Sequence, residues 1–513
     1  MLKRLSATRF WLLASTLSVT ILAIGIAPYG RSDHADNFWF ARLYIDIFHH
    51  DGYWGDWHFA PVPNLFPEIS LYFLLSSLGL GFGQISLVYP LAILTLSATL
   101  VFLLARILTQ ENSTAALAAL SFSATLILVG EEVSAWSRPT IHYGTFFNLL
   151  LALVVLNYLL ASSRSKFWLW LVLFLSISII GTASDFLFIP IFLAAMVGAT
   201  GLSWIFCQLT LGKGFLLVVV TLFGIGVGIG AYFFLVPNAY SNPVWASGLS
   251  LRYVSTNLEP HINALFFLTS QCLERPYLLV GLIFAAALPR IIQKSSADNS
   301  RYVFIVSGFV VAGLLANLYV FGLGAQGGAL YRYTVFATNI SLFLVCLSLA
   351  ATIRLLPINK KILFVVCYII LGITALMCLV QFRSDTKNTK QEYTALLRVS
   401  NCVQTVISSE KKLGLADYHW ANKLTVLTKG RIILSPVKGN TLGFMPWLGT
   451  RHWANHDFHF IVTQRNVSES VYGHKMLVYP LSTEKAITLA GNPDKTSVCG
   501  NLVLLHYSDP IQI

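Results

Sequence analysis

Long apolar runs constrain this chain more than any other feature. Runs of roughly 18–25 apolar residues can cross about 30 Å of hydrocarbon as a helix, and eleven stretches approach that length. They are Phe10–Ala27, Ile85–Leu108, Ala115–Gly130, Thr145–Ala161, Phe167–Ala183, Phe186–Cys207, Phe215–Val236, Tyr277–Ile292, Tyr302–Gly322, Tyr333–Ile353 and Ile362–Gln381. Of the 513 residues only 11% are charged, against roughly 25% in soluble domains. The chain is therefore predicted to be a polytopic α-helical membrane protein with about eleven spans, which excludes an ordinary cytosolic enzyme.

The distribution of Lys and Arg predicts how these spans are oriented. If the spans alternate from a cytoplasmic N-terminus, the loops on that side hold thirteen basic residues and two acids, whereas the opposite short loops hold six and eleven. Cytoplasmic loops are enriched in Lys and Arg, so we expect the N-terminus inside and the C-terminal tail outside. The formal net charge of +12 is then mostly a topology signal, and it gives no reason to expect a nucleic-acid partner.

Two apolar segments allow more than one interpretation. Phe66–Phe82 contains Pro67, Glu68 and several glycines, and a span there would reverse every later loop and remove the charge asymmetry, so we expect a helix lying in the outer interface. The first stretch follows Met1-Leu-Lys-Arg, which resembles the start of a signal peptide. It is long for one and lacks a clear small-x-small cleavage site. We interpret it as a retained span, with the cleaved form as the alternative.

The chain divides into two predicted domains. Residues 1–382 form the membrane domain, with an outer loop and juxtamembrane helices at 28–84, and residues 383–513 form a periplasmic domain. The tail shows a helical stretch near Glu392–Lys412 and several strand-like runs, which predict a small α/β domain. These runs are Arg431–Pro436, Phe458–Thr463, Lys475–Tyr479 and Asn501–Tyr507.

Cysteine and histidine patterns in the tail suggest structural roles. Cys402 and Cys499 are its only cysteines, and in an oxidising compartment they are expected to form a disulfide; two buried free thiols are the alternative. His452, His456 and His459 have spacings that suit a metal site on a helix face. The run around His459 looks like a strand, on which the three rings would not converge, so we favour a structural or surface role.

Acidic residues gather at the predicted outer rim of the membrane. A coupled transporter would be expected to keep ionisable groups near mid-bilayer, whereas here the spans are almost free of them. The rim acids are Asp33, Asp36, Asp46, Asp51, Asp56, Glu68, Glu131, Glu132 and Asp185. Trp39, Trp54 and Trp57 lie among the first-loop acids, and their faces could stack on sugar rings. The loop as a whole is therefore predicted to carry chemistry at the rim.

The order of these features resembles the GT-C superfamily of membrane glycosyltransferases. Members have a long first outer loop with an acidic motif directly after the first span, and Asp33-His-Ala-Asp36 occupies that place. The segment 60–75, Ala-Pro-Val-Pro-Asn-Leu-Phe-Pro-Glu-Ile-Ser-Leu-Tyr-Phe-Leu-Leu, is similar to their Pro-Pro-Leu-Tyr-Tyr type segment. Leu103-Leu-Ala-Arg-Ile-Leu and Trp136-Ser-Arg-Pro-Thr-Ile-His-Tyr also fit.

The motif resemblance covers roughly residues 1–160, and beyond them it is one of architecture. Two positions depart from the family pattern. His34 stands where a second acid often follows the first, and Val62 separates the prolines of the juxtamembrane segment. Both departures leave the catalytic register open.

The resemblance implies transfer of a sugar from a polyprenyl-phosphate donor on the outer face of a bacterial inner membrane. A carboxylate would take the proton of the acceptor hydroxyl. Asp36 and Asp33 are the candidates, with Asp36 placed first because Phe38, Trp39 and Phe40 follow it; Glu68, Asp185 and Asp56 are supporting acids. Guanidinium groups match phosphate oxygens bidentately, and the candidates for the departing phosphate are Arg138, Arg252, Arg275 and Arg332.

Several properties stay open at this stage. The resemblance leaves undecided which sugar is moved, whether the acceptor is a glycan, a lipid or a protein, and whether a divalent cation takes part. A transporter or lipid flippase is one alternative function, and it predicts an internal repeat and a polar path across the membrane, neither of which we find in the sequence. A non-catalytic GT-C-like scaffold, with the tail as its binding module, is another.

Overall fold

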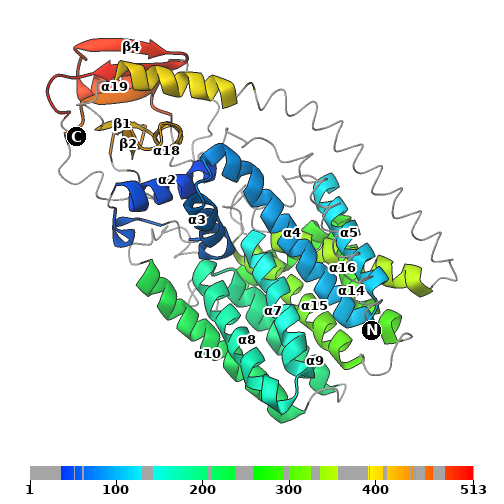
Figure 1. The fold of residues 1–513 in the computed structure, drawn as a ribbon. Coiled ribbons are helices and arrows are strands. Elements are labelled where there is room, and N and C mark those ends of the chain that lie inside the picture. The colour runs from blue at the N-terminus through cyan, green and yellow to red at the C-terminus, as the bar shows by residue number, and fades with distance from the viewer. Residues whose placement is uncertain are drawn as a thin grey trace.

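The structure of the chain is a computed structural model. It describes residues 36–50, 52–59, 63–129, 143–205, 210–236, 258–293, 300–324, 335–355, 391, 393–407, 413–439, 441–443, 445, 457–465 and 480–511. Figure 1 shows a bundle of long helices, a layer of short segments at one end of it, and a small sheet beyond that layer. We call the end of the bundle that faces this layer the sheet end.

The bundle consists of nine described helices that coincide with nine of the eleven predicted spans. They are α4 (Phe82–Thr109), α5 (Asn112–Val129), α7 (Tyr143–Ala161), α8 (Arg164–Ser184), α9 (Phe188–Ile205), α10 (Leu211–Leu235), α14 (Pro276–Gln293), α15 (Ser300–Gly324) and α16 (Val335–Leu355). Six of them, α4, α7, α8, α9, α10 and α16, are long and apolar enough to cross a membrane. The runs Phe10–Ala27 and Ile362–Gln381 lie outside the described residues, so the total of about eleven stays a prediction.

Burial separates central from peripheral helices. In the apolar windows of α7 and α16, 78% of residues are buried, against 33% in α10. A helix that is apolar on all sides is stable only inside a core or against lipid, and the low burial of α10 fits a place at the periphery of a bundle in a membrane. Helix α10 packs closely on α8 through Gly228, where an added Cβ would lie 2.7 Å from the Ile179 carbonyl oxygen. Small residues permit such close helix contacts in membranes.

Ionisable side chains avoid the middle of the bundle helices. In the nine described helices every Lys or Arg lies within the first or last four residues, and none of the nine contains Asp or Glu. The basic residues are Arg106, Arg164, Lys166, Lys213, Arg290, Arg301 and Arg354. All belong to loops or helix ends that the sequence assigned to the cytoplasm.

The segment between the predicted spans Phe215–Val236 and Tyr277–Ile292 contains a helix that the sequence analysis did not describe. Helix α13 covers Glu259–Glu274. Glu259, His261 and Glu274 interrupt its apolar pattern, which is why hydropathy alone gave no span there. The helix carries a proline in its first turn, a position where proline is well tolerated.

The layer at the sheet end is built from the first loop and the juxtamembrane segment. It contains α2 (Asp36–His49), the short helices η1 (Trp54–Asp56) and η2 (Leu65–Ile69), and α3 (Ser70–Ser77). The apolar helical stretch Leu65–Ser77 is too short to span a membrane, as the charge pattern required. Figure 1 shows α2 and α3 between the bundle and the sheet.

Aromatic side chains give this layer a core of its own. The Trp39 ring lies edge-on to Trp57 and Phe59, at centroid distances of 6.4 and 5.8 Å. Phe38 stacks on Phe82 at the start of α4, 4.3 Å between centroids. Trp39, Trp57 and Phe59 are buried. These aromatic residues of the first loop therefore pack against each other and the bundle, whereas Phe48 and Tyr53 are exposed.

The C-terminal region forms a five-stranded mixed sheet. Its elements are β1 (Leu413–Asp417), α18 (Tyr418–Leu427), β2 (Ile433–Val437), β3 (Phe460–Gln464), α19 (Thr483–Ala490), β4 (Lys495–Cys499) and β5 (Leu502–His506). The strand order is β2-β1-β3-β5-β4. Strand β1 pairs in parallel with β2 and β3, whereas β5 is antiparallel to β3 and β4.

Helices cover both faces of this sheet. One core contains Val403, from the helix at 393–406, together with α18 side chains and Phe460. The other contains Ala486 of α19 and Ile461. Phe460 and Ile461 lie on opposite faces because successive strand residues alternate.

The small α/β arrangement agrees with the sequence prediction, although two strands were missed. The predicted runs Arg431–Pro436, Phe458–Thr463 and Asn501–Tyr507 overlap β2, β3 and β5, and the predicted helical stretch overlaps the helix at 393–406. The run Lys475–Tyr479 and the expected domain boundary at 382/383 lie outside the described residues. Strand β1 is rich in small residues and β4 is an exposed, polar edge strand, so neither has a strong strand pattern.

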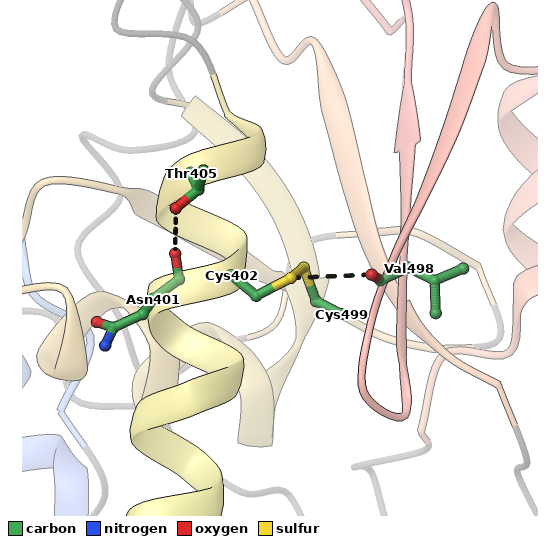
Figure 2. The surroundings of a disulfide bond; sticks show 5 residues. All are labelled: Asn401, Cys402, Thr405, Val498 and Cys499. Carbon is green, nitrogen blue, oxygen red and sulfur yellow. Dashed lines mark hydrogen bonds between the residues drawn. A yellow bond between two sulfur atoms is a disulfide. The ribbon is translucent and has the colours of Figure 1, made fainter.

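A disulfide joins the two ends of this region (Figure 2). Cys402 on the helix at 393–406 is bonded to Cys499 at the end of β4, and the two Cα atoms are 5.7 Å apart. That separation is usual for a disulfide. The pairing is the one expected from the sequence.

Candidate functional site

Buried polar side chains converge where η2 meets the ends of α7 and α8, at the sheet end of the bundle. Two of them, Glu68 and Asp185, are acids, each about 2% exposed. We call the group the rim cluster; its members are Glu68, Tyr89, Tyr143, Thr145, Asn148, Ser184 and Asp185. It joins residues that are far apart in the sequence, because α7 begins where α8 ends.

Glu68 accepts a hydrogen bond from the first turn of α7. Its Oε1 atom lies 2.8 Å from the Gly144 backbone N–H nitrogen. A Cβ at Gly144 would lie 2.2 Å from the same oxygen, so the carboxyl group occupies space that only glycine leaves. The N-terminal turn of a helix has free N–H groups that need acceptors, and the Glu68 carboxyl oxygen supplies one.

Asp185 contacts the same end of α7. It caps the C-terminus of α8, and its Oδ1 accepts a hydrogen bond of 2.9 Å from the Leu187 N–H. Its Oδ2 accepts one from the Thr145 hydroxyl. Two acids separated by 117 positions therefore meet around the first turn of α7.

Backbone hydrogen bonds fix the juxtamembrane segment to these two helices. The Asn148 side-chain amide donates to the Phe66 carbonyl oxygen at 3.0 Å, and the Phe66 N–H donates to Ser184 Oγ at 3.0 Å. The Asn64 N–H reaches the Ser184 carbonyl oxygen at 3.1 Å. The position of η2, and therefore of Glu68, is set by α7 and α8 together.

Burial changes the ionisation of Glu68. It raises the pKa of this carboxyl to about 8, the nearby Asp185 raises it further, and the Gly144 N–H opposes the rise. Removing a carboxylate from water disfavours its charged form, so Glu68 is mainly protonated at neutral pH. A protonated carboxyl can donate a hydrogen bond or a proton, whereas an ionised one can only accept. The protonated Glu68 carboxyl is therefore a proton donor within the rim cluster.

The other predicted acids are distributed along the first loop. Asp36 is the first residue of α2, and Asp33 lies outside the described residues. Asp56 is half-buried in η1. Asp46 is buried and accepts a hydrogen bond of 2.6 Å from the Trp57 indole, which makes it structural. The Trp54 indole donates to the Leu235 carbonyl oxygen at the end of α10, so the first loop also contacts the bundle there.

Of the four predicted phosphate-binding arginines, only Arg275 is described. It is half-buried at the turn between α13 and α14, where its N–H donates to the Gln271 carbonyl oxygen at 2.9 Å. Those two helices pack mainly on α15 and α16. Arg138, Arg252 and Arg332 lie outside the described residues, and the phosphate-binding role of all four stays a prediction.

Sequence reasoning missed several members of the rim cluster. Thr145 and Asn148 were taken only as part of an apolar span, and Tyr89 lies near the start of another. Polar residues near the start of a long apolar helix were the available signal, since such groups need partners in a membrane. Tyr89 is buried and interacts electrostatically with Glu68 and Tyr143.

Side-chain groupings in the described part of the chain give no candidate metal site. Among the described residues, no group of three or more His, Cys, Asp or Glu side chains could hold a metal ion. His459 precedes β3 and belongs to this part of the chain, whereas His452 and His456 lie outside it. The structural or surface role of the three histidines stays a prediction. Use of a divalent cation in the reaction is left open.

Comparisons with known proteins point to one fold. No protein-family model matches the sequence, and no curated protein sequence matches it. Among solved structures, ArnT from Cupriavidus metallidurans in the apo state is similar over 98% of both chains, with a TM-score of 0.54 and 14% identity. The same protein bound to undecaprenyl phosphate is similar over 96% of this chain and 97% of that one, with a TM-score of 0.53 and 13% identity. ArnT is a GT-C glycosyltransferase, so the expected GT-C fold is confirmed.

Proposed function

We propose that this chain, which has the GT-C fold, is a glycosyltransferase that moves a sugar from a polyprenyl-phosphate donor to an acceptor at the outer rim of a bacterial inner membrane. The observation that carries the proposal is the likeness to ArnT over nearly the whole of both chains, in a structure with bound undecaprenyl phosphate. In this proposal the N-terminus is cytoplasmic, and the sheet end and the C-terminal sheet are periplasmic.

The reaction places its chemistry beside the layer at the sheet end. The acceptor hydroxyl oxygen attacks the anomeric carbon, the new C–O bond forms, and the bond to the donor phosphate breaks. Asp36 takes the hydroxyl proton as general base, with Asp33 as the alternative, and the polyprenyl phosphate leaves with the electron pair. Cationic side chains stabilise that phosphate; we propose Arg138, Arg252, Arg275 and Arg332 as candidates.

The rim cluster supports this site from the membrane side. Glu68 and Asp185 hold η2 and the ends of α7 and α8 in one arrangement, and η2 leads directly into α3, which packs on α2. A protonated Glu68 adds no negative charge near the place where a phosphate must bind. Asp56 is a further supporting acid in η1.

Two observations weigh against transport as the function. The ionisable side chains in the described bundle helices lie at helix ends, whereas a coupled transporter needs them near the midplane. The buried acids that the structure describes lie at the sheet end and in the C-terminal region. These positions suit a reaction at the membrane surface better than a path across it.

Purified protein in lipid, given a labelled polyprenyl-phosphate sugar, tests the proposal. Asp36→Asn or Asp33→Asn is expected to lower the transfer rate by about 10²–10⁴-fold, because a general base contributes about that much. Asp509→Asn, which changes an exposed acid of the C-terminal region, is the control and should transfer at the parental rate.

The outcomes separate the three functions considered. Donor turnover supports glycosyl transfer, and movement of labelled lipid without bond cleavage supports a flippase. If neither turnover nor lipid movement is observed, the result supports a scaffold. If both single variants turn over donor at the parental rate, the first-loop acids are not the base.

A further inference from the structure

Arg42 is a fully buried arginine on α2 that binds the C-terminal region. Its side chain is 1% exposed. The Nη1 atom donates to the Ala421 carbonyl oxygen at 3.3 Å, to the Leu434 carbonyl oxygen at 3.1 Å, and to the Thr425 hydroxyl. All three partners are more than 370 positions away and belong to α18 and β2.

Thr425 connects three elements at this point. Its Oγ1 also accepts a hydrogen bond of 3.1 Å from the Leu434 N–H, and a hydroxyl oxygen can accept two such bonds. One arginine of α2 therefore meets α18 and β2 where those two are already bonded to each other. Hydrogen bonds from a charged donor are stronger and more directional than neutral ones, so this contact specifies one docking geometry.

Burying this cation is costly, because a guanidinium loses its hydration and cannot lose its proton at physiological pH. Asp46, four residues later on the same helix, compensates part of that cost. A buried hydrophobic side chain would have joined α2 to the C-terminal region without this desolvation cost. The use of an arginine here is explained if the orientation of α2, and not only its burial, has to be fixed.

A second contact holds the C-terminal end of α2. Gly430, in the turn after α18, has a φ of +76°, and a Cβ there would lie 2.3 Å from His50 Nε2 and 2.8 Å from Ile45 Cγ2. Tyr418 and Val426 of α18 also belong to the apolar core that continues into the bundle. The helix α2 is thus fixed against the C-terminal region at two places along its length.

Docking of α2 against the C-terminal region also orients its N-terminal end, where Asp36 is the first residue. Six residues separate Asp36 from Arg42, which is about 9 Å along a helix. We propose that Arg42 is a positioning residue: through α2 it uses the docked C-terminal region to set the place of Asp36 at the rim. The inference rests on the proposed function and deepens it, because it gives the C-terminal region a part in the reaction.

The test compares Arg42→Met, Arg42→Lys and Thr425→Val, all in the full chain in lipid with a labelled polyprenyl-phosphate sugar. Arg42→Met should lower kcat by about 10–100-fold and leave the KM for the donor within about twofold, as expected when only a transition-state interaction is lost. Arg42→Lys should restore part of kcat, and Thr425→Val should lower it less than Arg42→Met. Arg431→Met, which removes an exposed arginine in the turn after α18, is the matched control and should leave kcat unchanged.

A double variant separates positioning from general damage. If Arg42 acts through Asp36, Arg42→Met combined with Asp36→Asn should be no more than about twofold slower than Asp36→Asn alone, because residues that act as a unit are not additive. Multiplied effects, or a parental kcat in Arg42→Met, would overturn the proposal. If Arg42→Met does not insert, the same comparison is made with Arg42→Lys and Thr425→Val.

Hydrogen exchange distinguishes failure of this inference from failure of the proposed function. Arg42→Met should raise exchange of α2 amides at least tenfold while α4 and α7 stay protected. If Asp36→Asn turns out to have the parental rate, the base assignment fails, yet α2 exchange still reports docking. Unchanged α2 exchange in Arg42→Met would overturn the positioning role whatever the activity.

Discussion

The rim cluster and the Arg42 contact both bury ionisable groups, but they compensate the cost in opposite ways. Glu68 takes up a proton, so its burial removes the charge. Arg42 keeps its charge: burial lowers the pKa of its guanidinium to about 10, still well above neutral pH, and its Nη1 donates to two carbonyl oxygens and a hydroxyl instead. The first interface can therefore change its charge within the physiological range, whereas the second is a fixed link.

This comparison predicts a pH dependence that belongs to one interface. The pKa of Glu68 is about 8 in the folded protein and near 4.5 when unfolded. Between those values the folded state holds a proton that the unfolded state has released, so stability falls as pH rises from about 4.5 to 8, by at most about 1.4 kcal/mol per pH unit. Below pH 4.5 both states are protonated and this contribution is constant.

Thermal unfolding in detergent between pH 5 and 8 measures this effect. Glu68→Gln cannot ionise, so it should lose stability less steeply across this range than the parent. Arg42→Met should keep the parental slope, because the pKa of Arg42 lies above the range. Equal slopes in Glu68→Gln and the parent would contradict the burial of a neutral acid.

Gly144→Ala should disrupt the rim cluster by steric means. The added methyl group would lie 2.2 Å from Glu68 Oε1. The carboxyl group must therefore move away from the Gly144 N–H, from which it accepts a hydrogen bond. Overpacking of this kind costs about 1–3 kcal/mol, with loss of a buried hydrogen bond in addition. Gly226→Ala in α10 is the control, since nothing lies within 4 Å of its Cβ position. A similar change in thermal stability for both variants would argue against close packing at Glu68.

Gly430→Ala should weaken the docking of the C-terminal region. It combines an unfavourable positive φ with a contact on His50, and we expect a cost of about 1–2 kcal/mol, in the range of backbone strain at such positions. Gly79→Ala, in the turn after α3, with a φ of +83° and nothing within 4 Å, isolates the backbone part. The docking contact is supported if Gly430→Ala lowers the unfolding temperature more and increases α2 exchange; equal effects would leave only backbone strain.

The two regions also differ in how far the sequence could predict them. The bundle helices were found because long apolar runs have few alternatives in a membrane, and the rim acids were found because charge is rare there. That Glu68 and Asp185 meet could not be predicted, since 117 positions separate them and their meeting depends on the packing of α7 against α8. The first loop was expected to be aromatic and acidic, but its aromatic core follows from tertiary contacts between Trp39, Trp57 and Phe59.

Arg42 shows the limit of charge counting. In the sequence it is one of six basic residues in the outer short loops, and nothing distinguishes it from a solvated loop residue. Its burial depends on α18 and β2, which lie almost four hundred positions away. Strand β1 was missed as well, because its central place in the sheet follows from parallel pairing with β2 and β3 and its small residues give no pattern.

The Cys402–Cys499 bond has a consequence for how the protein is made. As the chain is synthesised, Cys402 emerges 97 residues before its partner, and no other cysteine lies between them or after them. The Cys402 thiol therefore has no competing cysteine between the two positions, and it cannot form this bond until Cys499 has emerged. Only a chain synthesised through β4 can acquire the bond, so a product truncated before Cys499 stays open and is chemically distinguishable to any thiol-directed quality control.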